Sequence, residues 1–276
     1  MPQIDIESLD DPRLDVYRSL RKTNTTRRRN VFIAEGTTVV ERLFRSRFPV
    51  QSVLITDQRL SDFRARIPEA TVVYRLSKDL AALLVGYTFH MGVLAAAHRQ
   101  PSPSLETTLP AAGPSMVLCG DRIIDPQNVG LLIRIASAFG ADALVLTDGS
   151  ADPFSRRAIR VSMGNGLFLP VVTGVEAAEV VDTTHALGYS CLGTVLSDEA
   201  VELATFTFPE RCVIVFGNET HGIRDGFLSQ CQHLLTVPML NGTDSLNVAI
   251  SAGIFSYAWR SRYPSSGQVE NNHRQQ

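Results

Sequence analysis

Short apolar segments alternate with helical patterns through the second half of this 276-residue chain. Apolar runs predict strands at 116–119, 143–146, 167–171, 190–195, 213–216 and 234–237. Helical periodicity lies between most of these runs, at 129–139, 154–161, 175–187 and 246–259. Strands that alternate with helices form a mostly parallel sheet with both faces covered. We therefore expect an α/β fold for 116–263.

A smaller unit with the same alternation precedes it. Strands are expected at 32–34, 52–56, 71–74 and 91–97, and helices at 37–44 and 77–84. Residues 98–115 contain four prolines and several small polar residues, which is typical of a linker. The sequence thus predicts a small α/β domain at 13–97, a linker at 98–115, a larger domain at 116–263 and a flexible tail at 264–276.

The composition indicates a folded protein, because hydrophobic residues make up 44% of the chain and charged residues 20%. No apolar run reaches the length needed to span a membrane, and no secretory signal is visible. Cys119, Cys191, Cys212 and Cys231 are widely spaced and form no zinc-like cluster with histidine. We therefore expect free thiols, no metal site and a cytoplasmic location.

Positive charge is concentrated near the N-terminus. The chain carries a net charge of −2, yet residues 13–47 hold ten basic and three acidic side chains. Arginine suits phosphate contacts because its guanidinium stays ionised and can donate to two oxygens at once. A solvated basic face is the alternative interpretation of this cluster.

Two polar segments follow predicted strands of the larger unit. The segment 125–134 places Asn128 and Arg134 in the first turns of a helix. An arginine there must reach solvent or a carboxylate, because an unpaired charge is costly to bury. In the segment 213–223 a buried strand ends at Gly217, which allows a ligand close to the backbone, and Glu219 could hold an arginine or a neighbouring loop. An ordinary strand-to-helix turn is the alternative, and a lone loop histidine such as His221 is more often exposed than catalytic.

A third polar segment leads into the last predicted helix. The sequence Ser245-Leu246-Asn247 precedes a run of small and apolar residues, and Asp244 or Ser245 is expected to cap the helix. Helix packing explains the apolar stripe that follows. It does not explain a polar side chain at Asn247.

The order, spacing and placement of these three segments resemble the SpoU/TrmH family of RNA ribose 2′-O-methyltransferases across 116–263. The smaller unit resembles the L30e-like RNA-binding domain that many members carry, with Phe-Ile-Ala-Glu-Gly at 32–36. Thr220-His221 and Ala249 depart from the common pattern. The resemblance implies a deep trefoil knot near the C-terminus (SPOUT fold), bound S-adenosylmethionine, and a homodimer with catalytic residues gathered at the subunit interface.

The resemblance also implies which residues act. Carried over by position, the cofactor-binding residues are Thr194, Gly217, Val237, Met239 and Leu246, and the catalytic residues are Asn128, Arg134, Glu219, Ser245 and Asn247. The basic region would supply RNA-binding residues, namely Arg21, Lys22, Arg27, Arg28 and Arg29.

The implied reaction is methyl transfer from S-adenosylmethionine to a ribose 2′-hydroxyl. The family assigns removal of the hydroxyl proton to the arginine that matches Arg134. Because free arginine stays protonated far above neutral pH, we expect Arg134 instead to bind the adjacent phosphate and lower the pKa of the hydroxyl. The other four catalytic residues would position Arg134, the ribose and the cofactor.

Ribosomal RNA of the large subunit is the expected substrate, by analogy with two-domain members of the family. Transfer RNA is the alternative substrate within the same enzyme class. The sequence does not separate a housekeeping modification from one that confers antibiotic resistance. A non-catalytic RNA-binding protein of this fold is a further alternative, which the intact Arg134, Glu219 and Asn247 disfavour. A nucleotide-dependent oxidoreductase is disfavoured because no Gly-x-Gly-x-x-Gly follows the first strand of the larger unit.

Overall fold

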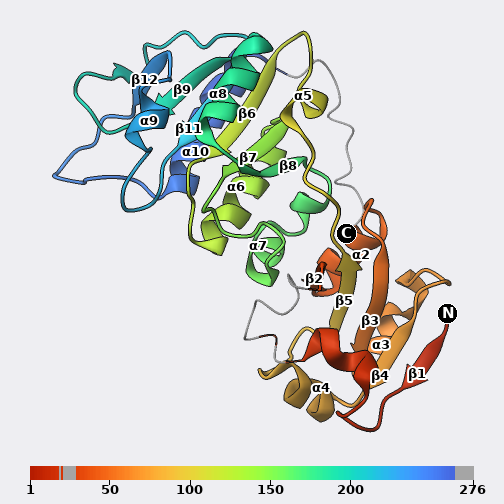
Figure 1. The fold of residues 1–276 in the computed structure, drawn as a ribbon. Helices are drawn as coiled ribbons and strands as arrows, with labels where there is room; N and C mark the ends of the chain where they lie inside the picture. Colours follow the sequence, from red (N-terminus) through yellow and green to blue (C-terminus); the bar gives the residue numbers. More distant parts are fainter. Residues whose placement is uncertain (19, 21–28, 265–276) are drawn as a thin grey trace.

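The chain folds into two α/β units, each built around its own sheet (Figure 1). The computed structural model describes residues 1–18, 20 and 29–264. The smaller unit holds a five-stranded sheet of order β1-β4-β3-β5-β2, and the larger unit a seven-stranded sheet of order β10-β12-β9-β11-β6-β7-β8. All strand pairs of the larger sheet are parallel, which confirms the predicted α/β class. No helix in the described ranges is long and apolar enough to cross a membrane.

The smaller unit mixes parallel and antiparallel strands. Its strands are β1 (Gln3–Asp5), β2 (Val31–Glu35), β3 (Val50–Thr56), β4 (Val73–Leu76) and β5 (Val93–His98). Its helices are η1 (Pro12–Tyr17), α2 (Thr37–Phe44), α3 (Asp57–Phe63), η2 (Arg64–Arg66) and α4 (Lys78–Val85). Strand β5 runs antiparallel to β2 and β3, while β1 and β3 are parallel to β4. Buried side chains of α2 and α3 cover one face of the sheet, and those of η1 and α4 cover the other.

The larger unit has three layers. Its strands are β6 (Ser115–Gly120), β7 (Ala143–Thr147), β8 (Val171–Val175), β9 (Ser190–Thr194), β10 (Val201–Glu202), β11 (Arg211–Phe216) and β12 (His233–Thr236). Its helices are α5 (Leu105–Thr108), α6 (Pro126–Ala138), α7 (Arg156–Val161), η3 (Asn165–Leu167), α8 (Ala177–Ala186), α9 (Asp225–Leu228) and α10 (Val248–Arg262). Alternate strand residues face α6 and α10 on one side and α5, α8 and α9 on the other, as strand geometry requires.

Helices α6 and α7 approach each other closely at Gly130. A Cβ atom added to Gly130 would lie 2.7 Å from the carbonyl oxygen of Ala158 and 2.8 Å from Cβ of Val161. Only a residue without a side chain fits this backbone contact. Helix α7 therefore packs directly on the helix that begins with the first polar segment.

Three arginines join the two units. Arg42 of α2 donates to the carbonyl oxygen of Met163 at 2.7 Å and to Oδ1 of Asn165 at 2.9 Å. Arg99 pairs with Asp152 through two hydrogen bonds of 2.9 and 2.6 Å. Arg156 of α7 donates to Oε2 of Glu35, whose side chain is only 3% exposed, at 3.0 Å. Ile159 and Leu167 of the larger unit are also part of a hydrophobic core of the smaller one.

Several predicted boundaries need correction. Strand β1 pairs with β4, so the smaller unit begins before residue 13. The strand predicted at 167–171 is wrong, because Leu167 ends η3 and β8 begins only at Val171. The apolar run has another cause: Leu167 is buried against the smaller unit, and Leu169 against the core under α6. The linker also contains α5 and ends inside β6.

The last helix begins at Val248, two residues later than predicted. Asn247, and neither Asp244 nor Ser245, caps this helix by accepting a hydrogen bond of 2.9 Å from the backbone N–H of Ala249. Asparagine is a favoured residue at this position. Helix capping thus accounts for the polar residue that helix packing left unexplained.

Candidate active site

A cavity of about 780 Å³ lies at the carboxyl ends of β9, β11 and β12. These strands are neighbours in the sheet, so the loops that follow them meet at one edge. All five residues predicted to bind the cofactor line this cavity: Thr194, Gly217, Val237, Met239 and Leu246. Three of the predicted catalytic residues, Glu219, Ser245 and Asn247, line it as well. The structure thus brings together eight residues from four separate segments of the sequence.

Gly217 has no room for a side chain. A Cβ atom there would lie 2.2 Å from the carbonyl carbon of Gly222 and 2.3 Å from the backbone nitrogen of Ile223. The loop closes on itself because Asn218 and Gly222 exchange two backbone hydrogen bonds of 2.9 and 3.0 Å. Glycine at 217 therefore allows the tight loop that walls this side of the cavity.

A chain of hydrogen bonds joins the three polar segments. Asn247 donates from Nδ2 to Oδ1 of Asn128 at 3.0 Å, and Asn128 donates from Nδ2 to Oε1 of Glu219 at 2.8 Å. Asn128 is buried, whereas Glu219 and Asn247 reach the cavity. Each segment thus contributes one side chain to the Asn247–Asn128–Glu219 chain.

Glu219 lies at the start of α6. Its carboxylate accepts hydrogen bonds of 3.3 Å from the backbone N–H groups of Ile124 and Asp125. A negative charge is favourable at a helix N-terminus, where backbone N–H groups lack partners within the helix. Two roles were expected for Glu219, and it has the second: its carboxylate binds a neighbouring loop, and it pairs with no arginine among the residues that the structure describes.

Arg134 of the same subunit lies away from the three hydrogen-bonded side chains. Its side chain is exposed, does not line the cavity, and makes no hydrogen bond or ion pair with any residue that the structure describes. Arg134 follows Asn128 by six positions, which places it about 240° around the axis of α6 and about 9 Å along it. One subunit alone therefore does not place Arg134 beside Glu219 and Asn247.

Comparison with known proteins decides the family. The SpoU rRNA Methylase family matches residues 115–257 of the chain. An uncharacterized tRNA/rRNA methyltransferase of Mycobacterium bovis is 34% identical over 261 residues, which cover 92% of this chain and 90% of that protein. The chain belongs to the SpoU family.

A second relative and a solved structure agree with this membership. The 23S rRNA (guanosine(2553)-2′-O)-methyltransferase RlmP of Bacillus subtilis is 30% identical over 259 residues, covering 92% of this chain and 98% of that protein. The structure of an AdoMet-bound rRNA methyltransferase from Sinorhizobium meliloti has the same fold, with a TM-score of 0.82 over 95% of this chain and 99% of that one, at 22% identity. The match to the SpoU family model lies in the larger unit, and the solved structure shares the fold of both units.

Two sets of hydrogen bonds that stabilise this SpoU-family site were not predicted from the sequence. Asn218 donates from Nδ2 to the carbonyl oxygen of Arg122 at 2.8 Å, and its Oδ1 accepts from the backbone N–H groups of Thr220 and His221. The fully buried Asp121 binds Arg224, whose pKa is raised by hydrogen bonding to that carboxylate. The only signal was an acidic residue directly after a buried strand, and nothing identified its partner 103 residues away.

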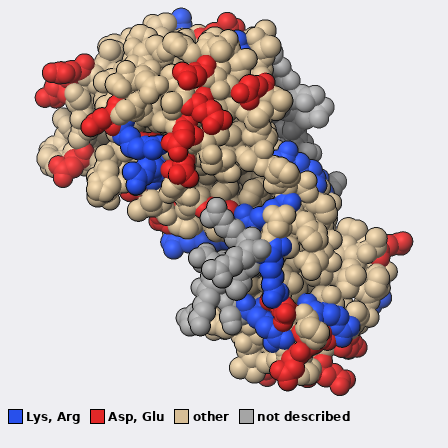
Figure 2. Space-filling view, viewed as in Figure 1, with Lys and Arg blue, Asp and Glu red and all other residues tan. Residues whose placement is uncertain are grey.

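Four of the predicted RNA-binding residues, Arg21, Lys22, Arg27 and Arg28, lie outside the described residues. The fifth, Arg29, is within 3.4 Å of the Asp15 carboxylate, and both side chains are about half exposed. Figure 2 shows further Lys and Arg side chains around the junction of the two units, whereas Asp and Glu are frequent on the outer part of the larger unit. On this face, Lys and Arg are thus frequent where the two units of this SpoU-family chain meet.

Proposed function

We propose that this protein transfers a methyl group from S-adenosylmethionine to the 2′-hydroxyl of a ribose in ribosomal RNA. The observation that carries this proposal is the Asn247–Asn128–Glu219 chain, which joins all three polar segments beside one large cavity. A structural role alone would not require an open cavity at this place. The relative from Bacillus subtilis, named as a 23S rRNA 2′-O-methyltransferase, supports the choice of ribosomal RNA.

The cavity fits the proposed cofactor. Val237 and Leu246 supply apolar surface for an adenine ring, and the tight loop at Gly217 exposes backbone groups to the cavity. Thr194 donates from Oγ1 to the carbonyl oxygen of Val215 at 2.8 Å, which fixes the end of β9 against β11. When bound, S-adenosylmethionine would supply an electrophilic methyl group on a positively charged sulfur.

Four of the residues would position the ribose and the cofactor, and Arg134 would act on the reacting hydroxyl. Alignment of the hydroxyl oxygen with the methyl carbon accounts for a large part of the rate in such displacements. Ser245 and Asn247 lie at the cavity wall, where they can hold the sugar, and Glu219 holds Asn128 and the start of α6 in place. Arg134 would bind the phosphate next to the reacting ribose and lower the pKa of the 2′-hydroxyl. The hydroxyl proton would be lost late or pass to that phosphate, as the O–CH3 bond forms and the S–CH3 bond breaks.

We propose further that Arg134 reaches the site from a second copy of the chain. Ile250 and Tyr257 of α10 are seven residues apart on one helix face and are 55% and 65% exposed. A Cβ atom at Gly253, between them, would meet open space. This apolar face, on the helix that packs against α6, suits a symmetric dimer contact that would bring the partner's Arg134 to the cavity.

The roles of the two units complete the proposal. The smaller unit, an L30e-like domain, would bind RNA through the basic segment before β2. The larger unit would contain a trefoil knot: the segment after β12 ends beside Asn128 of α6, and α10 then packs back on α6. Two crossing loops of this kind would hold the cofactor cavity in shape.

The function is tested by mapping 2′-O-methyl groups on RNA from cells with and without the gene. We expect one ribosomal RNA position to lose its methyl group in the deletion strain, and purified protein with S-adenosylmethionine to restore it. A lost methyl group in transfer RNA, with ribosomal RNA unchanged, would contradict the substrate. Failure of S-adenosylmethionine to bind in calorimetry would contradict the enzyme itself.

Mixed dimers test the source of Arg134. Arg134→Ala and Glu219→Ala should each inactivate the pure homodimer. If Arg134 acts across the dimer, co-expression of the two variants gives mixed dimers with one intact site, and about a quarter of wild-type activity returns. If Arg134 acts within its own subunit, the co-expressed variants stay inactive.

A further inference from the structure

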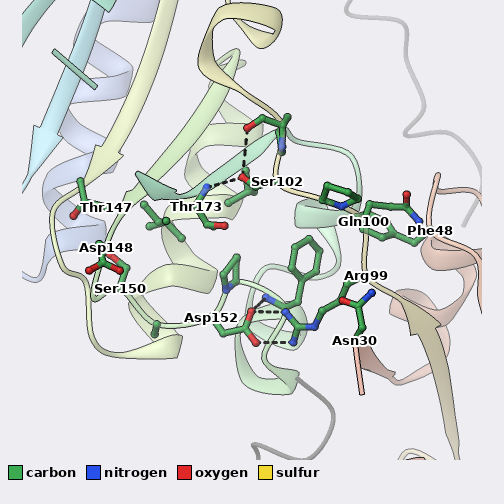
Figure 3. A pocket seen from close by; sticks show the side chains of 18 of the residues that line it. Asn30, Phe48, Arg99, Gln100, Ser102, Thr147, Asp148, Ser150, Asp152 and Thr173 are labelled. Atoms are coloured by element: carbon green, nitrogen blue, oxygen red, sulfur yellow. Dashed lines mark hydrogen bonds and ion pairs between the residues drawn. The ribbon is translucent and has the colours of Figure 1, made fainter. Parts of the chain in front are cut away.

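A second cavity lies where the two units meet. It has a volume of about 210 Å³ and is lined by Asn30, Arg47 and Phe48 of the smaller unit, by the connection at 100–103, and by the ends of β7 and β8 of the larger unit. Figure 3 shows Thr147, Asp148 and Ser150 at one end, Asn30, Phe48 and Gln100 at the other, and the Arg99–Asp152 pair between them. Neither the methyl-transfer reaction nor the fold requires this cavity.

The wall between the two ends is rigid. Arg99, with a side chain 13% exposed, binds Asp152 through two hydrogen bonds and donates from Nε to the carbonyl oxygen of Val31 at 3.0 Å. Asp152 also accepts a hydrogen bond of 2.9 Å from the backbone N–H of Phe154. The guanidinium of Arg99 lies 5.6 Å from the centre of the Phe154 ring. These two charges neutralise each other, so they fix the wall and leave little net charge for a ligand.

Four polar side chains of this cavity have no such partners among the described residues. Among the described residues, no hydrogen bond or ion pair joins the side chains of Asn30, Arg47, Gln100 or Asp148 to another group, and all four are exposed. Arg47 contacts an aromatic ring instead, 5.4 Å from the centre of Phe48. The cavity therefore offers two amides, a carboxylate and a guanidinium stacked on a ring.

This set of groups selects for a particular ligand chemistry. A lone phosphate is disfavoured, because Asp148 offsets the charge of Arg47 and Asp152 already neutralises Arg99. An unpaired nucleoside offers what the cavity matches: a neutral ring that stacks on arginine, and N–H and hydroxyl groups that amides and a carboxylate can bind. The small volume suits a single unit of this kind and excludes a duplex.

We propose that the junction cavity binds one unpaired nucleoside of the RNA substrate, outside the methyl-transfer site. The inference rests on the proposed function, and it adds a point where the RNA is read. Strand β11, which ends at the cofactor cavity, is separated from β7 and β8 by β6. At about 4.8 Å per strand, β11 lies roughly 10–15 Å from β7 and β8, a distance that a few nucleotides can span.

The test compares exposed variants of the junction cavity in methylation of ribosomal RNA purified from the deletion strain. Gln100→Ala and Arg47→Ala should each raise KM for RNA about tenfold, the scale of a lost stacking or hydrogen-bonding contact, with kcat and S-adenosylmethionine affinity unchanged. Arg64→Ala is the matched control, since Arg64 is exposed on η2, lies outside the basic cluster of 13–47 and does not line the cavity. Melting temperatures of all variants check that the fold is kept.

The sign of the effect at Asp148 distinguishes the ligands. If its carboxylate binds N–H or hydroxyl groups of a nucleoside, Asp148→Asn raises KM for RNA several-fold. If a phosphate occupies the cavity, the same change removes repulsion and lowers KM, which would overturn the proposal. Asp182→Asn, on the exposed side of α8, is the control and should leave KM unchanged.

If wild-type protein methylates the RNA but KM is unchanged in Gln100→Ala, Arg47→Ala and Asp148→Asn, the proposed nucleoside site is overturned. Wild-type protein that methylates no RNA would instead contradict the proposed function. The two failures are therefore separate.

Discussion

The cofactor cavity and the junction between the two units are held together by different interactions. Around the cofactor cavity, loops of a single unit are joined by amide side chains and one carboxylate, in the Asn247–Asn128–Glu219 chain. At the junction, arginines of each unit bind carboxylates of the other, with Arg99–Asp152 and Arg156–Glu35 both mostly shielded from water. Hydrogen bonds between charged groups are roughly twice as strong as neutral ones. We infer that the units keep a fixed orientation, and that adjustment to ligands occurs in the loops.

The largest expected effect tests the junction. Glu35→Ala should lower the free energy of unfolding by about 3 kcal/mol, because Arg156 loses its buried partner and stays only 22% exposed. Urea titration measures this change. Arg160→Ala is the control: its guanidinium is 4.0 Å from the same carboxylate and 57% exposed, so the expected loss is below about 0.5 kcal/mol. An equal loss of unfolding free energy in Glu35→Ala and Arg160→Ala would show that the buried Arg156–Glu35 pair has no special role at the junction.

The second effect tests the cofactor cavity. Gly217→Ala should weaken S-adenosylmethionine binding about 100-fold, because the added methyl group would lie 2.2 Å from backbone atoms and must displace the loop. Calorimetry gives the affinity directly. Gly226→Ala should bind the cofactor normally, since a Cβ there meets nothing within 4 Å. Binding within twofold of wild type in Gly217→Ala would mean that this loop does not shape the cofactor site.

The smallest effect concerns the Asn247–Asn128–Glu219 chain. Asn128→Ala removes two hydrogen bonds that hold Glu219 and Asn247, each worth about 1 kcal/mol. We expect kcat for RNA methylation to fall about tenfold, with cofactor affinity nearly unchanged. Gln127→Ala, the exposed neighbour, should keep wild-type kcat. If Asn128→Ala keeps the full kcat, the two hydrogen bonds of Asn128 contribute to folding and not to the reaction.

Local sequence patterns were sufficient for much of the fold. The helix predicted at 37–44 has the observed bounds of α2, and most buried strands lie within one or two residues of their predicted positions. Convergence of the three polar segments could be expected because each follows a parallel strand of one sheet. Strand β1 could not, since three residues at a sheet edge carry no pattern of their own.

Other features depend on tertiary contacts that no local pattern reveals. Leu167 belongs to an apolar run that resembles a strand, yet it is buried by the other unit. The pairing of Asp121 with Arg224 joins loops that only the folded sheet brings together. Arg134 shows the limit most clearly: the motif identifies the residue, but its direction follows from the rotation of α6 and from contacts beyond a single subunit.

The close contact at Gly130 has a mechanical consequence. Helix α7 carries Arg156, which holds the smaller unit, and at Gly130 it touches the backbone of the helix that presents Asn128. Because this contact joins the backbone of α6 to the carbonyl of Ala158 and to the stiff, β-branched side chain of Val161, we expect a tilt of α7 to move α6. We therefore expect RNA binding to the smaller unit to shift the side-chain amide of Asn128. Substrate binding and alignment of the reacting groups would then be mechanically coupled through α7 and α6.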